Sequence, residues 1–323
     1  MKTIYILFCL FFLSSCESNH NPDNIDSASG ITSDPAVVFG NDCKNFAKRT
    51  YFNGEEIPEL LKHYKFYESC KNNIGSGCMG LASMYLDGND SNLIKSVELF
   101  KKSCDLLRGD GCKCTGDFYL NRNNIQAFAY YKKSCELNYG PGCSNSGNTS
   151  NLNNEPLSKQ IIFYERGCEL DDGYSCNMMG LYFLLGKGIS KNTDKALTYF
   201  KTACALNYGD GCRNYGLAFE NGIGVKTDIK NAFSYYERGC ELNSSLACGT
   251  LALLYLEGKG VRKNKQKAIE LFSKSCELGE PKGCFGAGIL CSDSKDKNQL
   301  KKGKNFLEKA CSQGEKEACS MLK

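Results

Sequence analysis

The chain has 323 residues, which is enough for two average domains or one long repeat array. Forty basic and thirty-six acidic side chains leave a formal net charge of +4. This mild balance, without a basic run, argues against nucleic-acid binding. Tryptophan is absent, histidine occurs twice and cysteine occurs twenty-one times, and cysteine usage on this scale reports on the redox compartment.

The first sixteen residues have the pattern of an export signal. Lys2 supplies a positive charge, and the apolar run over residues 4–13 is too short to span a bilayer. The sequence Leu13-Ser14-Ser15-Cys16 resembles the bacterial lipobox, in which the cysteine is acylated and becomes the mature N-terminus. We therefore predict a lipoprotein signal peptide over residues 1–15 and lipidation of Cys16. A plain secretory signal or a buried helix is the alternative.

The segment of residues 16–40 is rich in Asn, Ser, Asp and Pro and poor in apolar side chains. That composition is typical of a flexible tether. Glu17, directly after the predicted lipid-bearing cysteine, favours the outer membrane if the source is Gram-negative. We expect an exported lipoprotein, periplasmic or on the cell surface, held at a membrane by its N-terminal lipid.

From residue 41 to the C-terminus the sequence is periodic. Pairs of cysteines with seven residues between them begin every 31 to 36 residues, and a period of this length is typical of a solenoid. Within the pairs a recurring glycine (Gly109, Gly140, Gly173, Gly209) predicts a turn that brings two helix ends to disulfide distance. The predicted disulfides are Cys70–Cys78, Cys104–Cys112, Cys135–Cys143, Cys168–Cys176, Cys204–Cys212, Cys240–Cys248, Cys276–Cys284 and Cys311–Cys319.

Each period contains two helical patterns. Before the first cysteine, apolar residues recur at i, i+3, i+4 and i+7, as in Ala196, Tyr199, Phe200 and Ala203. After the second cysteine, a small residue at the fourth position would let two helices approach closely, as at Gly180, Gly216, Ala252 and Gly288. Gly-x-Gly steps followed by Asn, Asp or Thr predict the helix ends and starts. We expect an all-α fold, an α/α superhelical solenoid of about eight stacked antiparallel helix pairs over residues 41–323, with one disulfide staple per repeat.

Two features depart from this regularity. The segment of residues 144–151 after Cys143 has almost no apolar bulk, so we expect its helix to be short or frayed. Cys43, Cys114 and Cys291 have no partner at the repeat spacing and are candidates for unpaired thiols. Their odd number implies at least one free thiol or an intermolecular bond. A buried free cysteine that acts as an apolar filler is the favoured interpretation of Cys114 and Cys291.

Residues 182–204, in which Gly186-Lys187-Gly188 precedes Lys195-Ala196 and Tyr199-Phe200, resemble the Sel1-like repeat (SLR), a helix-pair motif related to the tetratricopeptide repeat. The cysteine spacing is similar to that of the Helicobacter cysteine-rich proteins. The resemblance covers residues 43–323. It implies stacked helix pairs in a superhelix with a concave face and a secreted or periplasmic setting. It also implies contact with host cells, penicillin binding and slow β-lactamase activity, as described for members.

No catalytic residue can be assigned from the sequence. The motif Ser-x-x-Lys occurs at residues 292–295 and 294–297 without the partner motifs of a serine β-lactamase, and two histidines cannot build the usual zinc site. We therefore expect a scaffold that binds a protein, peptide or cell-wall partner on its concave face, with no cofactor or metal. The alternatives are a slow β-lactamase or penicillin-binding protein and a purely structural spacer. Because β-lactams resemble peptidoglycan stem ends, a groove for cell-wall fragments could also bind penicillins.

Overall fold

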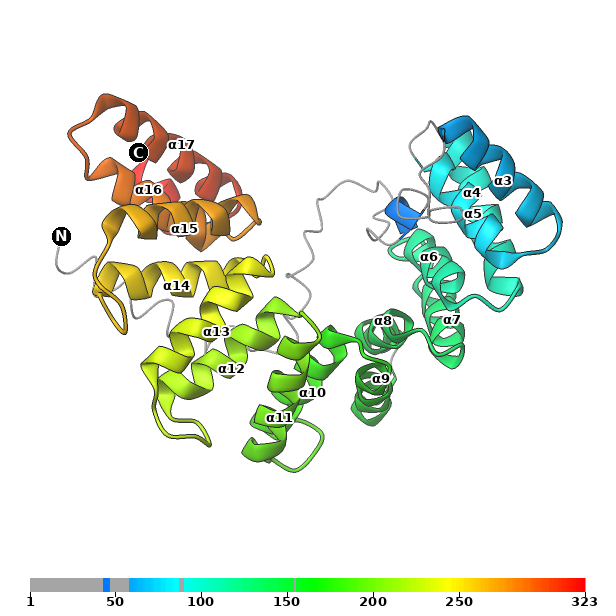
Figure 1. The fold of residues 1–323 in the computed structure, drawn as a ribbon, viewed down its shortest axis with the longest axis horizontal. Coiled ribbons are helices and arrows are strands. Elements are labelled where there is room, and N and C mark those ends of the chain that lie inside the picture. Colours follow the sequence, from blue (N-terminus) through cyan, green and yellow to red (C-terminus); the bar gives the residue numbers. More distant parts are fainter. Residues whose placement is uncertain (1–42, 47–57, 87–89, 154, 323) are drawn as a thin grey trace. The chain divides into compact units, whose positions relative to one another are not determined.

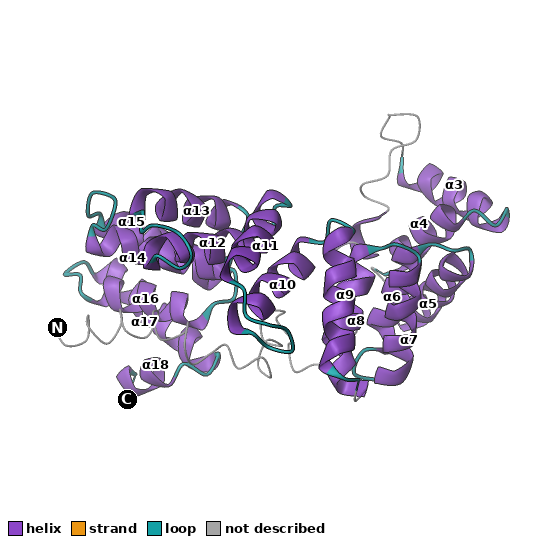
Figure 2. Cartoon of the chain, turned by 90° about the horizontal axis from the view of Figure 1, so that it is seen from below, coloured by secondary structure: helices purple, strands orange, loops and turns teal. Residues whose placement is uncertain are grey.

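The computed structural model describes residues 43–46, 58–86, 90–153 and 155–322. All regular structure in these ranges is helical (Figure 1, Figure 2), so the predicted all-α class is confirmed. The predicted signal peptide, Cys16 and the predicted tether lie outside the described residues. Within the described ranges, no helix is both long and apolar enough to cross a membrane.

Two kinds of helix alternate along the chain. Trailing helices end near the first cysteine of a pair, and leading helices contain the second. The trailing helices are α3 (Glu59–Lys71), α5 (Asp90–Asp105), α7 (Asn124–Glu136), α9 (Leu157–Glu169), α11 (Thr193–Ala205), α13 (Ile229–Glu241), α15 (Lys265–Glu277) and α17 (Lys297–Ser312). The leading helices are α4 (Gly75–Tyr85), α6 (Gly109–Tyr119), α8 (Gly140–Ser150), α10 (Gly173–Leu185), α12 (Gly209–Asn221), α14 (Ser245–Glu257), α16 (Pro281–Ser292) and α18 (Lys316–Met321).

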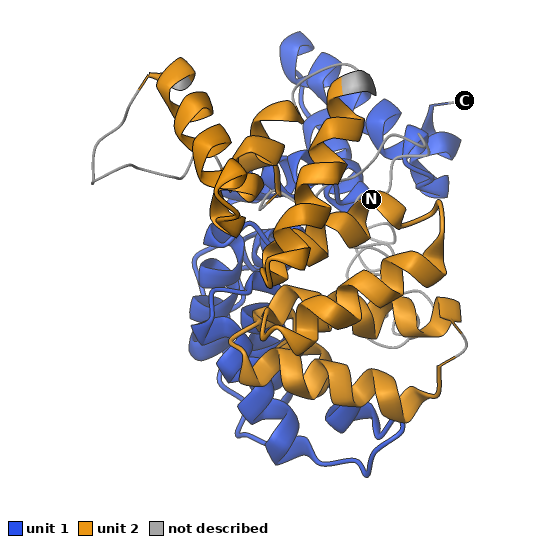
Figure 3. Cartoon of the chain, turned by 90° about the vertical axis from the view of Figure 1, so that its right-hand side faces the viewer, with its two compact units in different colours: residues 1–30, 180–323 blue, residues 31–179 orange. Residues whose placement is uncertain are grey.

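The chain divides into two compact units at residue 180 (Figure 3). In the unit that ends at residue 179, α4 packs against α5, α6 against α7 and α8 against α9. In the unit that begins at residue 180, α12 packs against α13, α14 against α15 and α16 against α17. Neighbours in sequence are thus neighbours in space, as expected for a helix-pair array.

One buried aromatic ring lies in the core on each trailing helix from α3 to α15, and Leu307 takes this place on α17. The ring of Phe200 lies against Gly180, where a Cβ atom would come within 2.5 Å of the ring. Tyr131 lies against Gly116 in the same way, also at 2.5 Å. These contacts confirm that the small residues permit close helix approach. The equivalent buried rings are Phe66, Phe100, Tyr131, Tyr164, Phe200, Tyr236 and Phe272.

The tight turn after each trailing helix differs from the prediction. The left-handed backbone belongs to asparagine at four of these eight turns, for example Asn138 with φ 59° and Asn207 with φ 61°, and to glycine only at the last two. Asparagine tolerates this region better than most residues. Gly109 instead begins α6, where a Cβ atom would lie 2.5 Å from Cβ of Tyr139 in the next turn. The recurring glycine is therefore required for close packing between repeats, and the prediction that it makes the turn is wrong.

The structure contains all eight predicted repeat disulfides, with Cα–Cα distances of 4.4 to 4.7 Å. It also contains a ninth, between Cys43 and Cys114, which are 71 positions apart in sequence. The expectation that Cys43 and Cys114 are unpaired, with Cys114 a free filler, is thus wrong. Spacing could not reveal this bond because its partners belong to different repeats. Cys291 is a free, buried cysteine on α16.

Helix α8 is complete, contrary to the expected short or frayed helix. Its hydroxyl side chains donate back to carbonyls of the preceding turn. Ser146 Oγ lies 2.8 Å from the Gly142 carbonyl oxygen, and Ser150 Oγ lies 2.7 Å from that of Ser146. On α9, Gln160 Nε2 donates to the Gly147 carbonyl oxygen at 2.9 Å. A buried helix that lacks apolar side chains can therefore form when its serine and threonine hydroxyl groups donate hydrogen bonds to backbone carbonyls of the same helix.

Candidate functional site

Three polar side chains occupy the same position on successive leading helices. Each lies five residues after the second cysteine of its pair: Ser83 on α4, Asp117 on α6 and Asn148 on α8. Helix α6 contacts both α4 and α8. We call these three residues the polar row.

The first position of the polar row binds a separate segment of the chain. Residues 43–46 form a short helical turn outside the helix pairs. Ser83 Oγ donates a hydrogen bond to the backbone carbonyl oxygen of Lys44 at 2.9 Å. The Arg108 guanidinium lies 5.7 Å from the centre of the Phe46 ring. Together with the bond from Cys43 to α6, these contacts seat a short peptide on the leading helices.

The second position is a buried ion pair. Lys113 Nζ lies 2.8 Å from Asp117 Oδ2, and the two side chains are only 8% and 6% exposed. Tyr131 donates its hydroxyl proton to Asp117 Oδ1 at 3.0 Å. The Cys43 sulfur lies 3.5 Å from the same carboxylate. Because the carboxylate is both paired and hydrogen-bonded, its burial is tolerated.

The third position is held by two tyrosines. The Asn148 side-chain oxygen Oδ1 accepts hydrogen bonds from Tyr164 at 2.6 Å and from Tyr174 at 2.9 Å. Asn148 itself is half-buried. Tyr164 comes from α9 and Tyr174 from the first turn of α10, so three helices fix the orientation of this one amide.

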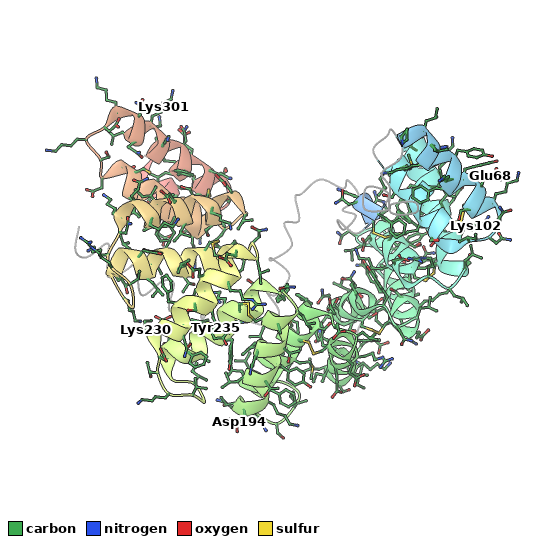
Figure 4. All side chains as sticks on the ribbon, in the orientation of Figure 1. Glu68, Lys102, Asp194, Lys230, Tyr235 and Lys301 are labelled. Atoms are coloured by element: carbon green, nitrogen blue, oxygen red, sulfur yellow. A yellow bond between two sulfur atoms is a disulfide. The ribbon has the colours of Figure 1, made fainter. Side chains whose placement is uncertain are left out.

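Half-exposed aromatic rings form another surface feature, in the unit that begins at residue 180. Phe219 and Tyr235 stack with their centres 5.7 Å apart, and Tyr215 meets Tyr235 edge-on at 4.8 Å. Figure 4 labels Tyr235 on α13. Phe183 and Tyr199 repeat the stacked pair at 5.5 Å. These rings join the leading and trailing helix of one repeat, and their primary role is packing.

An acidic group lies at the C-terminal end of the array. Burial, and then a hydrogen bond with Glu317, raise the pKa of the Glu315 carboxyl to about 7. Burial also raises the pKa of Glu280, which begins α16 by accepting from the Lys282 backbone N–H. Within the described ranges, no three His, Cys, Asp or Glu side chains are arranged to hold a metal ion.

The serines considered for β-lactam chemistry lie at the end of α16 and in the connection to α17. Ser294 Oγ accepts a hydrogen bond from the Asp296 backbone N–H at 3.1 Å, which is a turn contact. Sequence reasoning missed the polar row. Its signal was the shared register of residues 83, 117 and 148, but residue 148 fell in the segment expected to fray.

Comparison with known proteins identifies the class. The stacked helix pairs define a helical repeat scaffold. The model of the Sel1 repeat matches residues 75–106, 109–139, 173–208, 209–244, 245–280 and 281–315. The chain belongs to the Sel1 repeat family, which confirms the resemblance seen in the sequence. A search of curated proteins gives no match.

Three solved structures illustrate the likeness. A Sel1 repeat protein from Oxalobacter formigenes is 17% identical, with a TM-score of 0.62 over 77% of this chain and 99% of that one. The protective antigen c5321 of uropathogenic Escherichia coli, with an SLR fold, is 18% identical, with a TM-score of 0.58 over 85% of this chain and 62% of that one. The Helicobacter pylori cysteine-rich protein B is 38% identical, with a TM-score of 0.34 over 40% of this chain and 92% of that one.

Proposed function

We propose that this protein is an exported, lipid-anchored repeat scaffold that binds a protein or peptide partner on the face formed by its leading helices α4 and α6. The observation that carries the proposal is the seating of residues 43–46 on α4 and α6. A polypeptide segment lies there with its backbone hydrogen-bonded by Ser83 and its Phe46 ring against Arg108. Helix-pair repeats are suited to this role because each repeat offers a similar surface to one extended ligand.

The compartment follows from the cysteines. The nine disulfides between described residues indicate an oxidising, extracytoplasmic setting. The lipid anchor rests on the sequence Leu13-Ser14-Ser15-Cys16 alone. Cells fed a labelled fatty acid should label the wild-type protein and not the Cys16→Ser variant. Equal labelling of both would contradict the anchor.

The binding function is tested with the oxidised, exported protein and a display library of random peptides. The wild-type protein should enrich peptides that bind saturably and reversibly. Binding should be lost when the disulfides are reduced, because the leading helices then lose their fixed spacing. Failure to enrich any peptide would contradict the proposed function.

Hydrolysis of β-lactams stays a prediction from the family resemblance, and peptidoglycan fragments stay a candidate ligand class. Both are tested by incubating the same protein with a penicillin, a chromogenic cephalosporin and muropeptides. Turnover that follows the protein through two unrelated purifications and disappears on reduction would establish an enzyme. Competition between muropeptides and selected peptides would place cell-wall fragments on the same face.

A further inference from the structure

We propose that the unit that begins at residue 180 binds anionic lipid headgroups of a membrane through a basic edge. The basic edge consists of the four connections from a leading to a trailing helix, each taken with the first three residues of the helix that follows. Its segments are residues 186–195, 222–231, 258–267 and 293–299. Figure 4 labels Lys230, which lies in the second segment. The basic edge is separate from the proposed peptide-binding face on α4 and α6, and only the choice of a membrane as its partner rests on the proposed lipid anchor.

The four segments follow one another along one edge of the helix pairs. A Cβ atom on Gly224 would lie 2.7 Å from Cγ2 of Thr193, the first residue of α11. A Cβ atom on Gly260 would in the same way lie 2.9 Å from the first residue of α13. Lys265 continues this order, because its Nζ atom lies 2.8 Å from Asp293 Oδ2 in the last segment. Charges from four successive repeats therefore lie along one edge.

The basic edge differs in charge from the rest of the chain. It contains twelve basic and four acidic side chains, a net charge of +8, whereas the whole chain has a net charge of only +4. The connections at the other ends of these helices, counted in the same way over residues 206–211, 242–247, 278–283 and 313–318, contain four acidic and two basic side chains. Positive charge is thus concentrated on one edge of the unit and is absent in net terms from the opposite edge.

Several cations of the basic edge are available to a partner. Four of them are exposed and form no ion pair with any residue that the structure describes: Arg262, Lys263, Lys295 and Lys297. A cation that is not already paired keeps its full attraction for an anion that approaches from the solvent.

The residue types of the basic edge favour a membrane over a specific anionic ligand. Eleven of its twelve cations are lysines, which act as mobile point charges, whereas the arginine fork is suited to recognition of single phosphate or sulfate groups. The four segments contain no aromatic residue, so no ring is present there to stack on a base or a sugar. A row of exposed lysines instead suits the many anionic headgroups of a bilayer surface. The proposed N-terminal lipid would keep such headgroups at a high local concentration.

The test measures binding of the oxidised protein to lipid vesicles by sedimentation. The chain that begins at residue 17 is used, because it keeps every residue that the structure describes and carries no lipid of its own. One set of vesicles contains phosphatidylcholine alone. The other set contains phosphatidylcholine with an equal amount of phosphatidylglycerol, which supplies the negative charge.

Two variants that lose the same number of charges are compared with the wild-type protein. The edge variant is Arg262→Gln/Lys263→Gln/Lys297→Gln. The control variant removes three exposed lysines outside the basic edge and is Lys71→Gln/Lys201→Gln/Lys316→Gln. Circular dichroism and the melting temperature show that each variant is folded.

We expect the wild-type protein to bind the anionic vesicles and not the vesicles of phosphatidylcholine alone. Each cation close to an anionic bilayer strengthens binding about fivefold, so the edge variant should bind at least about 10-fold more weakly than wild type. The control variant should bind about as tightly as wild type. Raising the NaCl concentration from about 0.1 M to about 1 M should release the wild-type protein, because the Debye length falls from about 10 Å to about 3 Å.

Absence of binding to the anionic vesicles would overturn this inference. An equal loss of binding in the edge and control variants would also overturn it, because net charge and not the basic edge would then be responsible. Binding to heparin without binding to the vesicles would show that the occupant is a soluble polyanion and would overturn the membrane assignment. Peptide selection and fatty-acid labelling do not depend on the basic edge, so each of these outcomes leaves the proposed function standing.

Discussion

The ammonium group of Lys274 lies 2.7 Å from the backbone carbonyl oxygen of Cys240, one repeat earlier. The same contact recurs from Lys102 to Cys70 at 2.9 Å and from Lys309 to Cys276 at 3.2 Å. Each lysine stands two residues before its own first cysteine. This carbonyl belongs to the last turn of a trailing helix and has no partner within that helix. The lysine ammonium group therefore supplies its hydrogen bond and also lies at the negative end of the helix dipole.

These contacts link neighbouring repeats, so we expect Lys274→Met to lower the free energy of unfolding by about 1 kcal/mol. Lys267→Met, on the exposed face of the same helix, serves as the control because, among the described residues, the Lys267 side chain is paired only with Glu270. Urea denaturation followed by circular dichroism measures both. Equal effects of the two substitutions would show that the contact from Lys274 to Cys240 adds no stability.

The disulfides differ in the length of chain that they close. In the loop-entropy model, a repeat disulfide such as Cys135–Cys143 contributes about 2.6 kcal/mol, and the bond between Cys43 and Cys114 contributes about 4.4 kcal/mol. We therefore expect the double variant Cys43→Ser/Cys114→Ser to lose more stability than Cys135→Ser/Cys143→Ser. Both bonds lie in the unit that ends at residue 179, which makes the comparison fair. The reverse order in urea denaturation would contradict the entropic account.

The sequence predicted those parts of the fold that depend on short separations. The cysteine pairs, the Gly-x-Gly steps and the helix start at Asp228, whose carboxylate accepts from the backbone N–H groups of Lys230 and Asn231, are all encoded within a few residues. The Sel1 repeat pattern adds the register between them. In a periodic array the same short-range signals recur in every repeat, and this is why the helix pairs and their disulfides could be predicted from the sequence.

The missed features depend on contacts between repeats. Cys43 finds Cys114 only because residues 43–46 lie on α4 and α6. Helix α8 is complete because its serines bond within the helix while α9 satisfies the Gly147 carbonyl. The side-chain amide of Asn148 is oriented only because Tyr164 and Tyr174 reach it from two other helices. Each of these requires the packed structure and not the repeat pattern.

Glu315 should make the C-terminal repeat sensitive to pH. Its pKa is raised from 4.5 to about 7 in the folded protein, first by burial and then by the hydrogen bond with Glu317. The folded state therefore binds more protons than the unfolded state between these values. Its contribution to stability is fully present below pH 4.5 and is lost as the pH rises through 7.

We expect the protection of α17 and α18 against hydrogen exchange, corrected for intrinsic rates, to fall between pH 5 and pH 8. The Glu315→Gln variant should show a flatter profile and be more stable than wild type at pH 8. Glu308→Gln, on the exposed face of α17, controls for the loss of one negative charge. A fall that persists unchanged in Glu315→Gln would assign the pH dependence to another group.

The ion pair of Lys113 and Asp117 should behave as a unit with Tyr131. Removing the carboxylate in Asp117→Ala leaves a lysine that is only 8% exposed without its main partner, and we expect a loss of about 3 to 5 kcal/mol. The triple variant Lys113→Met/Asp117→Leu/Tyr131→Phe removes all three polar groups together and should lose less than Asp117→Ala alone. Urea denaturation of the two variants and of the single variants Lys113→Met, Asp117→Leu and Tyr131→Phe completes the comparison. A triple variant as unstable as the sum of the single losses would mean that the three groups act independently, because only coupled groups give non-additive changes.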